Sequence, residues 1–376
     1  MKTRLLFTAV ALGLLAGCGG QQSEAPADGA AAAEEEKVLF VYNWSDYIAD
    51  DTIAQFEAET GIKVTYDVFD SNEVLEAKLM AGNTGYDIVV PSLSFLARQI
   101  MAGVFQPLDI TKLSNYGNLD DSLMQRIAAS DPRNAHSVPY LWGTTGIGYN
   151  VGKVAEALGE DYEVTSWDLV FNPENAAKIS GCGLALLDAP SEILPIALQY
   201  LGEDPNSFDE EVIKKAEALM LSIRPYITYF HSSQYINDLA NGDICVAVGW
   251  SGDVFQAADR ASEADNGVEV DYVIPDEGAP MWFDMLAIPK DAKHPDNAHK
   301  FIDFLMRPEV IAEISNYVAY ASGNAASLEL VDEEVRDNPG VYPPPEVMEK
   351  LYPLKVLPPE VDRLYNRIWT TVRTGQ

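Results

Sequence analysis

The sequence predicts an α/β fold that is built around parallel sheet and divided into two domains. First, apolar strand-like runs alternate with amphipathic helical segments over the first stretch of about sixty residues beyond the N-terminal region. Second, a similar alternation resumes near residue 147. Third, the chain has 376 residues, which is too long for one ordinary core and suits two domains of typical size.

The first unit is predicted to alternate strand and helix three times. Residues 62–68 alternate apolar and polar side chains, as in a half-buried strand, whereas residues 86–90 form the continuous apolar run of a buried parallel strand. Residues 51–60 place Phe56 on an apolar helical face and stop at Gly61. The predicted elements are strand 38–42, helix 51–60, strand 62–68, helix 74–80, strand 86–90 and helix 94–102.

The pattern breaks over residues 108–139, which are rich in Asn, Asp and Ser and show no strand alternation. A strand at 147–150 is expected to begin the second α/β unit. Residues 343–359 are proline-rich and are not expected to form regular helix. The remaining predicted elements are helices 209–221, 235–240, 253–263, 297–306, 309–317 and 359–372, and strands 244–248, 270–274 and 283–288.

The N-terminal region has the features of a targeting segment. Lys2 and Arg4 precede an apolar stretch, residues 5–15, that is too short to span a bilayer as a mature helix. The following Leu-Ala-Gly-Cys resembles the bacterial lipobox, in which the Cys, here Cys18, is acylated. A simple signal peptide cut near Ala16 is the alternative. We expect a lipoprotein signal peptide over residues 1–17 and a disordered tether over residues 18–36, which lack large apolar side chains.

The charge of the chain restricts its partners. Asp and Glu total 58 against 25 Lys and Arg, a formal net charge of −33. Such a surface repels nucleic acid and anionic membranes, so neither is an expected partner, apart from membrane contact through the N-terminal lipid. Solubility alone accounts for much of such an excess, and the charge does not locate a binding site.

Two cysteines remain beyond Cys18, and an even pair in an exported protein suggests one disulfide. Two separate buried thiols, Cys182 and Cys245, are the alternative. The four histidines are scattered along the chain, so the sequence has no metal-ligand spacing, and we expect neither a metal nor a cofactor.

Three turns that follow apolar strands are the candidate binding loops. Residues 43–47, 91–94 and 249–253 stand where ligands bind in open α/β sheets, beyond the carboxyl ends of strands. Together they supply aromatic rings, hydroxyls and carboxylates, and they contain no Lys, Arg or His. Phosphates and carboxylates need cations or an amide cradle, whereas ammonium groups favour carboxylates and aromatic faces. Each feature also has a structural explanation, since a Trp can be core and Asp253 can cap a helix.

Longer segments of the chain resemble the periplasmic putrescine-binding proteins of polyamine ABC importers. The resemblance implies a type II periplasmic binding protein fold, with two α/β lobes joined by a multi-stranded hinge. It implies an N-terminal lobe of residues 37–142 plus about 283–318, and a C-terminal lobe of residues 143–282 plus about 319–376. The segments are YNWSDYIA at 42–49, FDSNEVLEAKLMAG at 69–82, HSSQYINDLANGDICVA at 231–247 and GWSGDV at 249–254.

The resemblance also implies roles for individual residues. An aromatic box would surround the methylene chain, one set of polar groups would bind one ammonium, and Glu192 with Asp46 would bind the other, partly through water. The box residues would be Trp44, Tyr47, Trp250 and Tyr320; the first ammonium would meet Ser45, Asp253 and Asp284; Ser92 and Ser232 would line the pocket; Cys182 and Cys245 would form the family's disulfide.

One position departs from the pattern that selects putrescine. Trp282 stands beside Asp284 where that pattern has Phe, and a Trp there resembles the spermidine-binding relatives. Ser94 and Ala189, in contrast, resemble the putrescine type.

The resemblance therefore implies a monomeric periplasmic protein that captures putrescine or a related polyamine and delivers it to an ABC permease. It implies no enzymatic activity. The alternatives are a polyamine sensor for a signalling partner, a type II binding protein for another small ligand such as iron or a sugar, and a hydrolase that would use Glu192 and Asp253 as paired acids.

Overall fold

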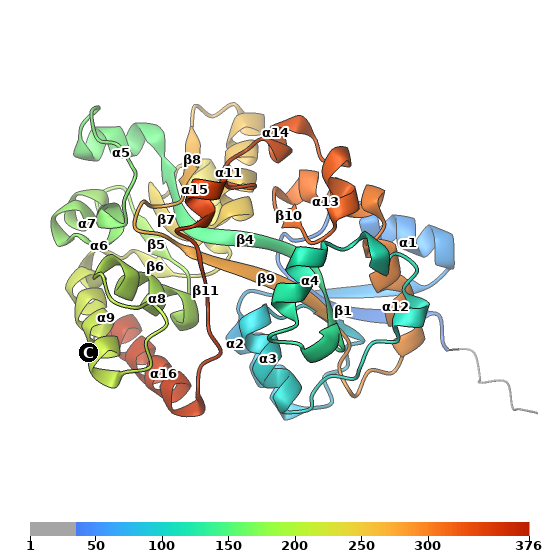
Figure 1. The fold of residues 1–376 in the computed structure, drawn as a ribbon. Coiled ribbons are helices and arrows are strands. Elements are labelled where there is room, and N and C mark those ends of the chain that lie inside the picture. Colours follow the sequence, from blue (N-terminus) through green and yellow to red (C-terminus); the bar gives the residue numbers. More distant parts are fainter. Residues whose placement is uncertain (1–34, 376) are drawn as a thin grey trace, which may run out of the picture. The chain divides into compact units, whose positions relative to one another are not determined.

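The computed structural model describes residues 35–375, which form one mixed sheet covered by helices (Figure 1). The main path of the sheet has the strand order β2-β1-β3-β9-β4-β7-β5-β6, and three shorter strands join it at β4 and β9. The strands are β1 (Val38–Trp44), β2 (Lys63–Phe69), β3 (Ile88–Val89), β4 (Ser137–Asn150), β5 (Leu184–Leu186), β6 (Tyr229–Phe230), β7 (Val246–Trp250), β8 (Val270–Val273), β9 (Pro280–Ala287), β10 (Ala321–Ser322) and β11 (Tyr352–Pro353).

Two parallel groups of strands stand at the two ends of this order. Strand β1 pairs in parallel with β2 and β3, and strand β5 pairs in parallel with β6 and β7. Ile88 and Val89 of β3 and Val246 of β7 are fully buried, as expected for strands covered on both faces. We call β2-β1-β3 the first half-sheet and β7-β5-β6 the second.

Helices flank each half-sheet (Figure 1). Beside the first lie α1 (Thr52–Thr60), α2 (Asn72–Ala81), α3 (Leu93–Met101), α4 (Asp121–Ile127), α12 (Pro295–Leu305) and α13 (Pro308–Val318). Beside the second lie α5 (Val151–Leu158), α6 (Asp168–Phe171), α7 (Pro173–Ile179), α8 (Pro190–Tyr200), α9 (Glu210–Ile223), α10 (Gln234–Asn241), α11 (Ser251–Ala264) and α16 (Pro359–Thr374). Shorter helices are α14 (Glu333–Arg336) and α15 (Pro345–Met348), and the 3₁₀ turns are η1 (Ile110–Lys112), η2 (Tyr116–Asn118), η3 (Pro132–Asn134), η4 (Arg224–Tyr226) and η5 (Ala325–Leu330).

Local capping explains where several helices begin and end. The side chain of Ser71 accepts a hydrogen bond from the backbone of α2, and the side chain of Asn150 does the same for α5. Such caps satisfy donors that the first helical turn leaves free. Helix α1 ends at Gly61, whose φ of 69° is a left-handed conformation that glycine adopts without strain.

Two antiparallel strands, β4 and β9, connect the half-sheets. Strand β9 pairs with β3 through Val89 and Ala287, and β4 pairs with both β9 and β7. The 14-residue β4 changes partner within one step, because Thr144 is the last residue in register with β9 and Thr145 the first in register with β7. These two strands therefore hold both half-sheets in one framework.

The structure corrects part of the predicted second unit. The strand predicted at 147–150 is the end of the longer β4, which bridges the sheet and does not begin a separate parallel unit. The prediction missed all elements between residues 151 and 200, because β5 has only three residues and α8 contains Pro195, which disguises it. The proline-rich segment, predicted to lack helix, forms the single turn α15.

The predicted lobe boundaries at 142/143 and 282/283 fall inside β4 and β9. The division into lobes stays a prediction. The predicted signal peptide, the lipidated Cys18 and nearly all of the tether lie outside the described residues. Within residues 35–375, no helix is both long and apolar enough to cross a membrane.

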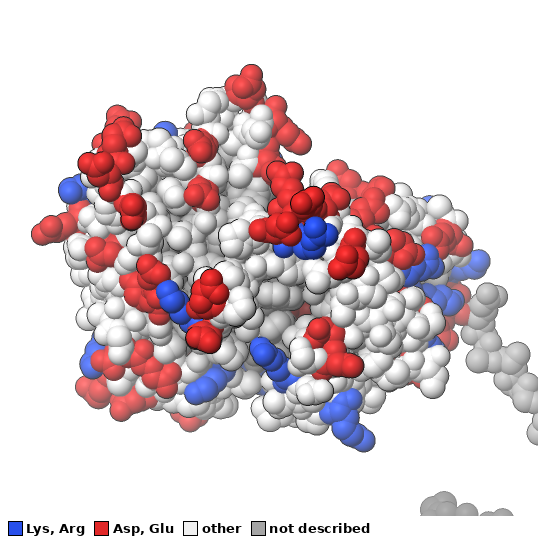
Figure 2. All heavy atoms as spheres, turned by 45° about the horizontal axis from the view of Figure 1, so that its top comes forward, with Lys and Arg blue, Asp and Glu red and all other residues white. Residues whose placement is uncertain are grey.

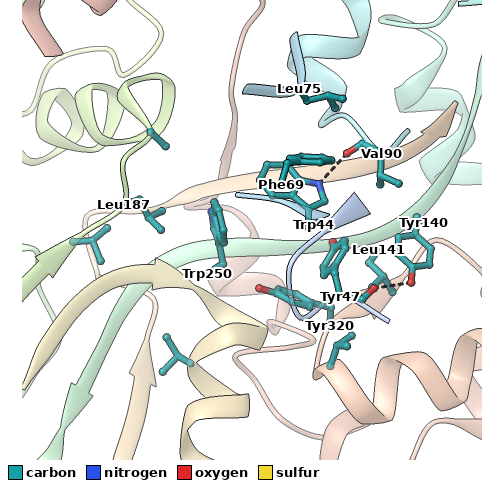
Figure 3. Close-up of a cluster of buried hydrophobic side chains, with 14 of the residues drawn as sticks. Trp44, Tyr47, Phe69, Leu75, Val90, Tyr140, Leu141, Leu187, Trp250 and Tyr320 are labelled. Atoms are coloured by element: carbon teal, nitrogen blue, oxygen red, sulfur yellow. Dashed lines mark hydrogen bonds between the residues drawn. The ribbon is translucent and has the colours of Figure 1, made fainter. Parts of the chain in front are cut away.

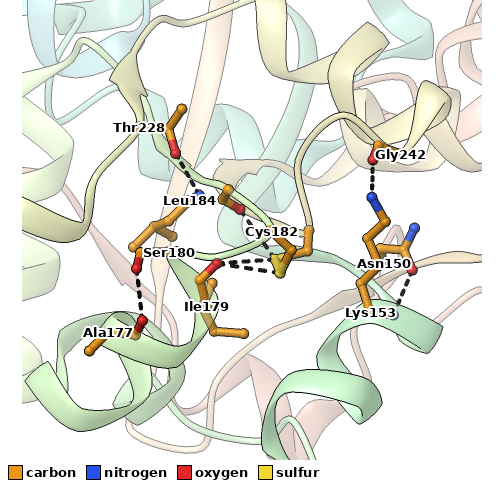
Figure 4. The surroundings of a disulfide bond; sticks show 11 residues. Asn150, Lys153, Ala177, Ile179, Ser180, Cys182, Leu184, Thr228 and Gly242 are labelled. Atoms are coloured by element: carbon orange, nitrogen blue, oxygen red, sulfur yellow. Dashed lines mark hydrogen bonds between the residues drawn. A yellow bond between two sulfur atoms is a disulfide. The ribbon is translucent and has the colours of Figure 1, made fainter.

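The predicted disulfide is present and joins Cys182 to Cys245, with 5.5 Å between their Cα atoms (Figure 4). Cys182 lies in the turn after α7, and Cys245 immediately precedes β7. The Sγ atoms of both cysteines lie close to the carbonyl oxygen of Ile179, at 3.3 and 3.6 Å. The bridge therefore fastens the end of α7 to the start of β7 in the second half-sheet.

Replacing both bridged cysteines with serine should destabilise the protein by about 4 kcal/mol, because the cross-link restricts an unfolded loop whose ends are 63 residues apart. Equilibrium unfolding in urea, with and without reductant, measures this change. Reductant should destabilise the unmodified protein and leave the double variant unchanged. Equal stability of the two proteins in the absence of reductant would contradict the prediction.

Candidate functional site

A cavity opens where the two half-sheets meet, beyond the carboxyl ends of β1, β2, β3 and β7. This is the position at which open α/β sheets bind ligands. Eleven of the twelve predicted site residues line it, and so do three that were not predicted. The lining consists of Trp44, Ser45, Tyr47, Phe69, Asp70, Ser92, Glu192, Ser232, Ser233, Trp250, Asp253, Trp282, Asp284 and Tyr320.

Five aromatic rings of this lining form a continuous chain of four edge-to-face contacts. The ring centroids are 5.3 Å apart for Trp44 and Trp250, 6.5 Å for Trp250 and Trp282, 5.4 Å for Trp282 and Tyr320, and 5.1 Å for Tyr320 and Tyr47. Figure 3 shows four of these side chains converging from both half-sheets, with the Trp44 indole fixed by its hydrogen bond to the carbonyl of Val90. Contacts of this kind restrict the orientation of each ring.

The carboxylate of Asp284, on β9, is held from the first half-sheet. Ser92 donates its hydroxyl hydrogen to Asp284 at 2.6 Å, and the amide of Asn72 donates to the Ser92 oxygen at 2.9 Å. Asp284 is 3% exposed, and burial raises its pKa to about 7. The hydrogen bond from Ser92 opposes this rise because it favours the ionised form.

Asp253 stands in the first turn of α11, directly after β7, and is also buried. Its two carboxylate oxygens accept hydrogen bonds from Tyr235 at 2.8 Å and Tyr320 at 2.7 Å. Burial raises the pKa of Asp253 to about 7, against the lowering effect of the two tyrosine hydroxyls. The side chain makes no cap contact, so the structural explanation weighed for this residue does not apply.

Glu192 is the third buried carboxylate and comes from the first turn of α8. The Trp250 indole lies 3.1 and 3.2 Å from its two oxygens, and the Thr145 hydroxyl donates to one of them. Burial raises the pKa of Glu192 above its usual range, although both donors act in the opposite direction. Its position on an unpredicted helix explains why periodicity alone did not lead to it.

The Tyr47 hydroxyl is shielded from solvent in the cavity wall and lies beside Asp284. Burial and the neighbouring Asp284 raise the pKa of Tyr47, so its hydroxyl stays protonated. The Tyr47 phenol in turn lowers the pKa of Asp284, because a hydrogen bond from the phenol favours the ionised carboxylate.

Asp46 is the one predicted site residue that does not line the cavity. It has a positive φ of 51°, and its carboxylate lies 2.7 Å from the guanidinium of Arg260. The Arg260 guanidinium pairs with this carboxylate outside the cavity. Direct contact between Asp46 and a ligand in the cavity is therefore absent from this geometry.

The lining residues that were not predicted are Phe69, Asp70 and Ser233. Phe69 and Asp70 end β2, and the same rule that selected the loops after the other parallel strands would have found them. Ser233 follows the predicted Ser232, whose hydroxyl accepts a hydrogen bond from the backbone of Asp188 at 3.1 Å.

The chemistry of the cavity favours cations. Three buried carboxylates face it, and its lining includes no Lys, Arg or His within the described part of the chain. Figure 2 shows one face of the molecule, over which Asp and Glu outnumber Lys and Arg. Anionic ligands would meet repulsion in the cavity, whereas an ammonium would gain charge-assisted hydrogen bonds and aromatic faces.

Comparison with known proteins identifies the family to which the chain is similar. Residues 51–343 match the family described as bacterial extracellular solute-binding protein. The chain is 58% identical over 345 residues to the putrescine-binding periplasmic protein PotF of Escherichia coli, covering 92% of this chain and 93% of that one. It is 58% identical over 348 residues to the putrescine-binding periplasmic protein SpuD of Pseudomonas aeruginosa, covering 93% and 95%.

A solved structure confirms the predicted fold class. The putative spermidine/putrescine ABC transporter from Listeria monocytogenes superposes with a TM-score of 0.81 at 33% identity, covering 91% of this chain and 100% of that one. The resemblance drawn from the sequence segments is thereby confirmed, as are the type II binding protein fold and the open mixed sheet.

Asp284→Asn should stabilise the ligand-free protein at pH 8. The pKa of Asp284 is about 7 in the folded state and about 3.9 in an unfolded chain, so the folded state binds more protons between these values and stability falls as pH rises through them. Melting temperatures at pH 5 and pH 8 should show a gain for the variant that is larger at pH 8. Asp204→Asn, an exposed change, is the control. A variant that is less stable than the unmodified protein at pH 8 would contradict this account.

Proposed function

The chain belongs to the bacterial extracellular solute-binding proteins, and from this membership we propose that it captures putrescine for an ABC importer. Its relatives bind and deliver solutes, so the hydrolase alternative has no support. The observation that carries the proposal is a cavity with three buried carboxylates, a chain of five aromatic rings in edge-to-face contact and no cation in its described lining.

A bound diammonium would offset the free-energy cost of the buried carboxylates. A buried carboxylate without a partner costs several kcal/mol, and a bound diammonium supplies the missing charge. Cation–π contact with the rings adds roughly 0.5–2 kcal/mol each. The methylenes between the ammonium groups would rest on the same rings and gain about 0.8 kcal/mol for each buried CH₂.

We assign one ammonium to Asp253 and Asp284, with Ser45 nearby, and the other to Glu192. The Tyr47 hydroxyl, which lies beside Asp284, would accept a hydrogen bond from the ligand. Asp46 would act only through water or through Arg260, which occupies its carboxylate. Ser92 and Ser232 would shape the wall.

A longer polyamine such as spermidine is the second candidate ligand. Three buried carboxylates exceed the two charges of putrescine, and Trp282 offers a large cation–π face. A polyamine sensor would use the same cavity and differs only in its protein partner.

We also propose that the two half-sheets and their helices act as lobes that close over the ligand, in a protein that is a monomer. The cavity takes lining from both, and only β4, β9 and the segment near Ala319 cross between the predicted lobes. Closure about such crossings is the usual behaviour of hinged binding proteins. We place the protein in the periplasm, tethered through a lipid on Cys18.

Replacing Asp253 or Asp284 with Asn should weaken putrescine binding by about 2–5 kcal/mol, because each change removes one partner of a buried charged pair while keeping its shape. Calorimetric titration with putrescine and spermidine measures this loss. Asp46→Asn should cost less, since that carboxylate is paired outside the cavity. The ligand would not occupy this cavity if both Asn variants bound within tenfold of the unmodified protein.

Cys18→Ser should release the protein from membranes or block its processing, because acylation of Cys18 supplies the buried methylenes that anchor it. Fractionation of cells that express each form measures the distribution. A protein with Cys18 that is recovered wholly in the soluble periplasmic fraction would exclude the lipid anchor and leave the proposed ligand unaffected.

A further inference from the structure

Thr145 lies at the point of β4 where the strand changes its pairing partner. It is the first residue in register with β7 after the strand leaves β9, so it stands at the junction of the two half-sheets. Its side chain is fully buried, and it is not among the residues that line the cavity. A hydroxyl at such a place must satisfy its hydrogen bonds within the protein.

The Thr145 hydroxyl connects two cavity residues that come from different elements. Its oxygen accepts a hydrogen bond from the Trp282 indole, on β9, at 3.1 Å. Its hydrogen is donated to a carboxylate oxygen of Glu192, on α8. The hydroxyl can make both bonds at once because it is one donor and also an acceptor.

The Glu192 carboxylate also accepts a direct hydrogen bond from another indole. Trp250, on β7, donates to Glu192 directly, and its ring meets the Trp282 ring edge to face at 6.5 Å between centroids. Glu192 therefore orients the N–H groups of both indoles. Trp250 is bonded to it directly, and Trp282 is bonded to it through Thr145. Two walls of the cavity and one of its carboxylates form a single hydrogen-bonded unit.

We propose that Thr145 is a positioning residue for polyamine recognition, which sets the orientation of Trp282 and keeps Glu192 as a hydrogen-bond acceptor for the ligand. This inference rests on the proposed function and deepens it. Thr145 does not touch the ligand and acts through the two residues that do.

Loss of the hydroxyl has two consequences. The Trp282 indole N–H is left without its acceptor and the ring is free to turn, and Glu192 loses a donor that favours its ionised form. Binding of a cation should then be weaker and should require a higher pH. The titratable groups that face Glu192 are Glu73 on α2, Asp284 on β9, and Tyr235, Tyr272 and Tyr352. Burial raises the pKa of the three tyrosines, so they stay neutral from pH 6 to 9, and only the two carboxyls share in this pH dependence.

The chain offers a matched control in the preceding residue. Thr144 is also a buried threonine of β4, but its hydroxyl pairs with Tyr272 at 2.7 Å and makes no contact with Glu192 or Trp282. Thr144→Val thus removes one buried hydroxyl from the same strand without breaking the unit.

The test is calorimetric titration of Thr145→Val, Thr145→Ser and Thr144→Val with putrescine at several pH values from 6 to 9. Near-ultraviolet circular dichroism of the ligand-free proteins reports the tryptophan environment. We expect Thr145→Val to lose about tenfold or more in affinity, to shift its binding profile to higher pH and to change the tryptophan signal. Thr145→Ser should retain the affinity and profile, and so should Thr144→Val. Thr145→Ala, which removes the same hydroxyl, replaces the Val variant if that protein does not fold.

The outcomes separate the two proposals. If the unmodified protein binds putrescine and Thr145→Val binds it equally with the same pH profile, the role of Thr145 is overturned and the proposed function stands. If Thr144→Val loses as much as Thr145→Val, the effect is general to the strand and the positioning role is overturned. If the unmodified protein does not bind putrescine, the proposed function is overturned together with this role.

Discussion

The desolvation of three carboxylates is the constraint on which the rest of this structure depends. Asp253, Asp284 and Glu192 are buried in one cavity wall, with no Lys, Arg or His among its described lining residues. Their own donors are neutral hydroxyls and indoles, which lessen the cost and do not remove it. Burial of these carboxylates therefore costs the folded protein free energy, and a bound cation offsets that cost.

The framework explains how such an arrangement persists. Strands β4 and β9 cross between the half-sheets and bring Asp284 and Trp282 to the cavity, while β7 and α11 bring Trp250 and Asp253. Each carboxylate is fixed by groups from another element, and the disulfide fastens the second half-sheet at the opposite end of β7.

The sequence predicted the parallel strands of the first half-sheet, β7, the candidate loops and the ligand class, because strand endings and residue chemistry are local features. It did not predict β5 and β6, which have only three and two residues. The bridging role of β4 was not predicted, because the sequence of a long strand that changes its pairing partner does not differ from that of any other apolar strand. Nor did periodicity find α8, and with it Glu192, which was predicted only through resemblance. Asp46, which the resemblance assigns to an ammonium partly through water, does not line the cavity and pairs with Arg260, so its role toward the ligand stays a prediction.

The central claim is that the cavity carboxylates are partly protonated when free and ionised when a dication is bound. The most direct measurement is calorimetric titration with putrescine at pH 7 in several buffers that differ in ionisation enthalpy, which counts protons exchanged on binding. With pKa values of about 7 for Asp253 and Asp284, binding should release on the order of one proton per putrescine. An observed enthalpy that does not vary with the buffer, at full binding, would show that no proton leaves and would contradict the account.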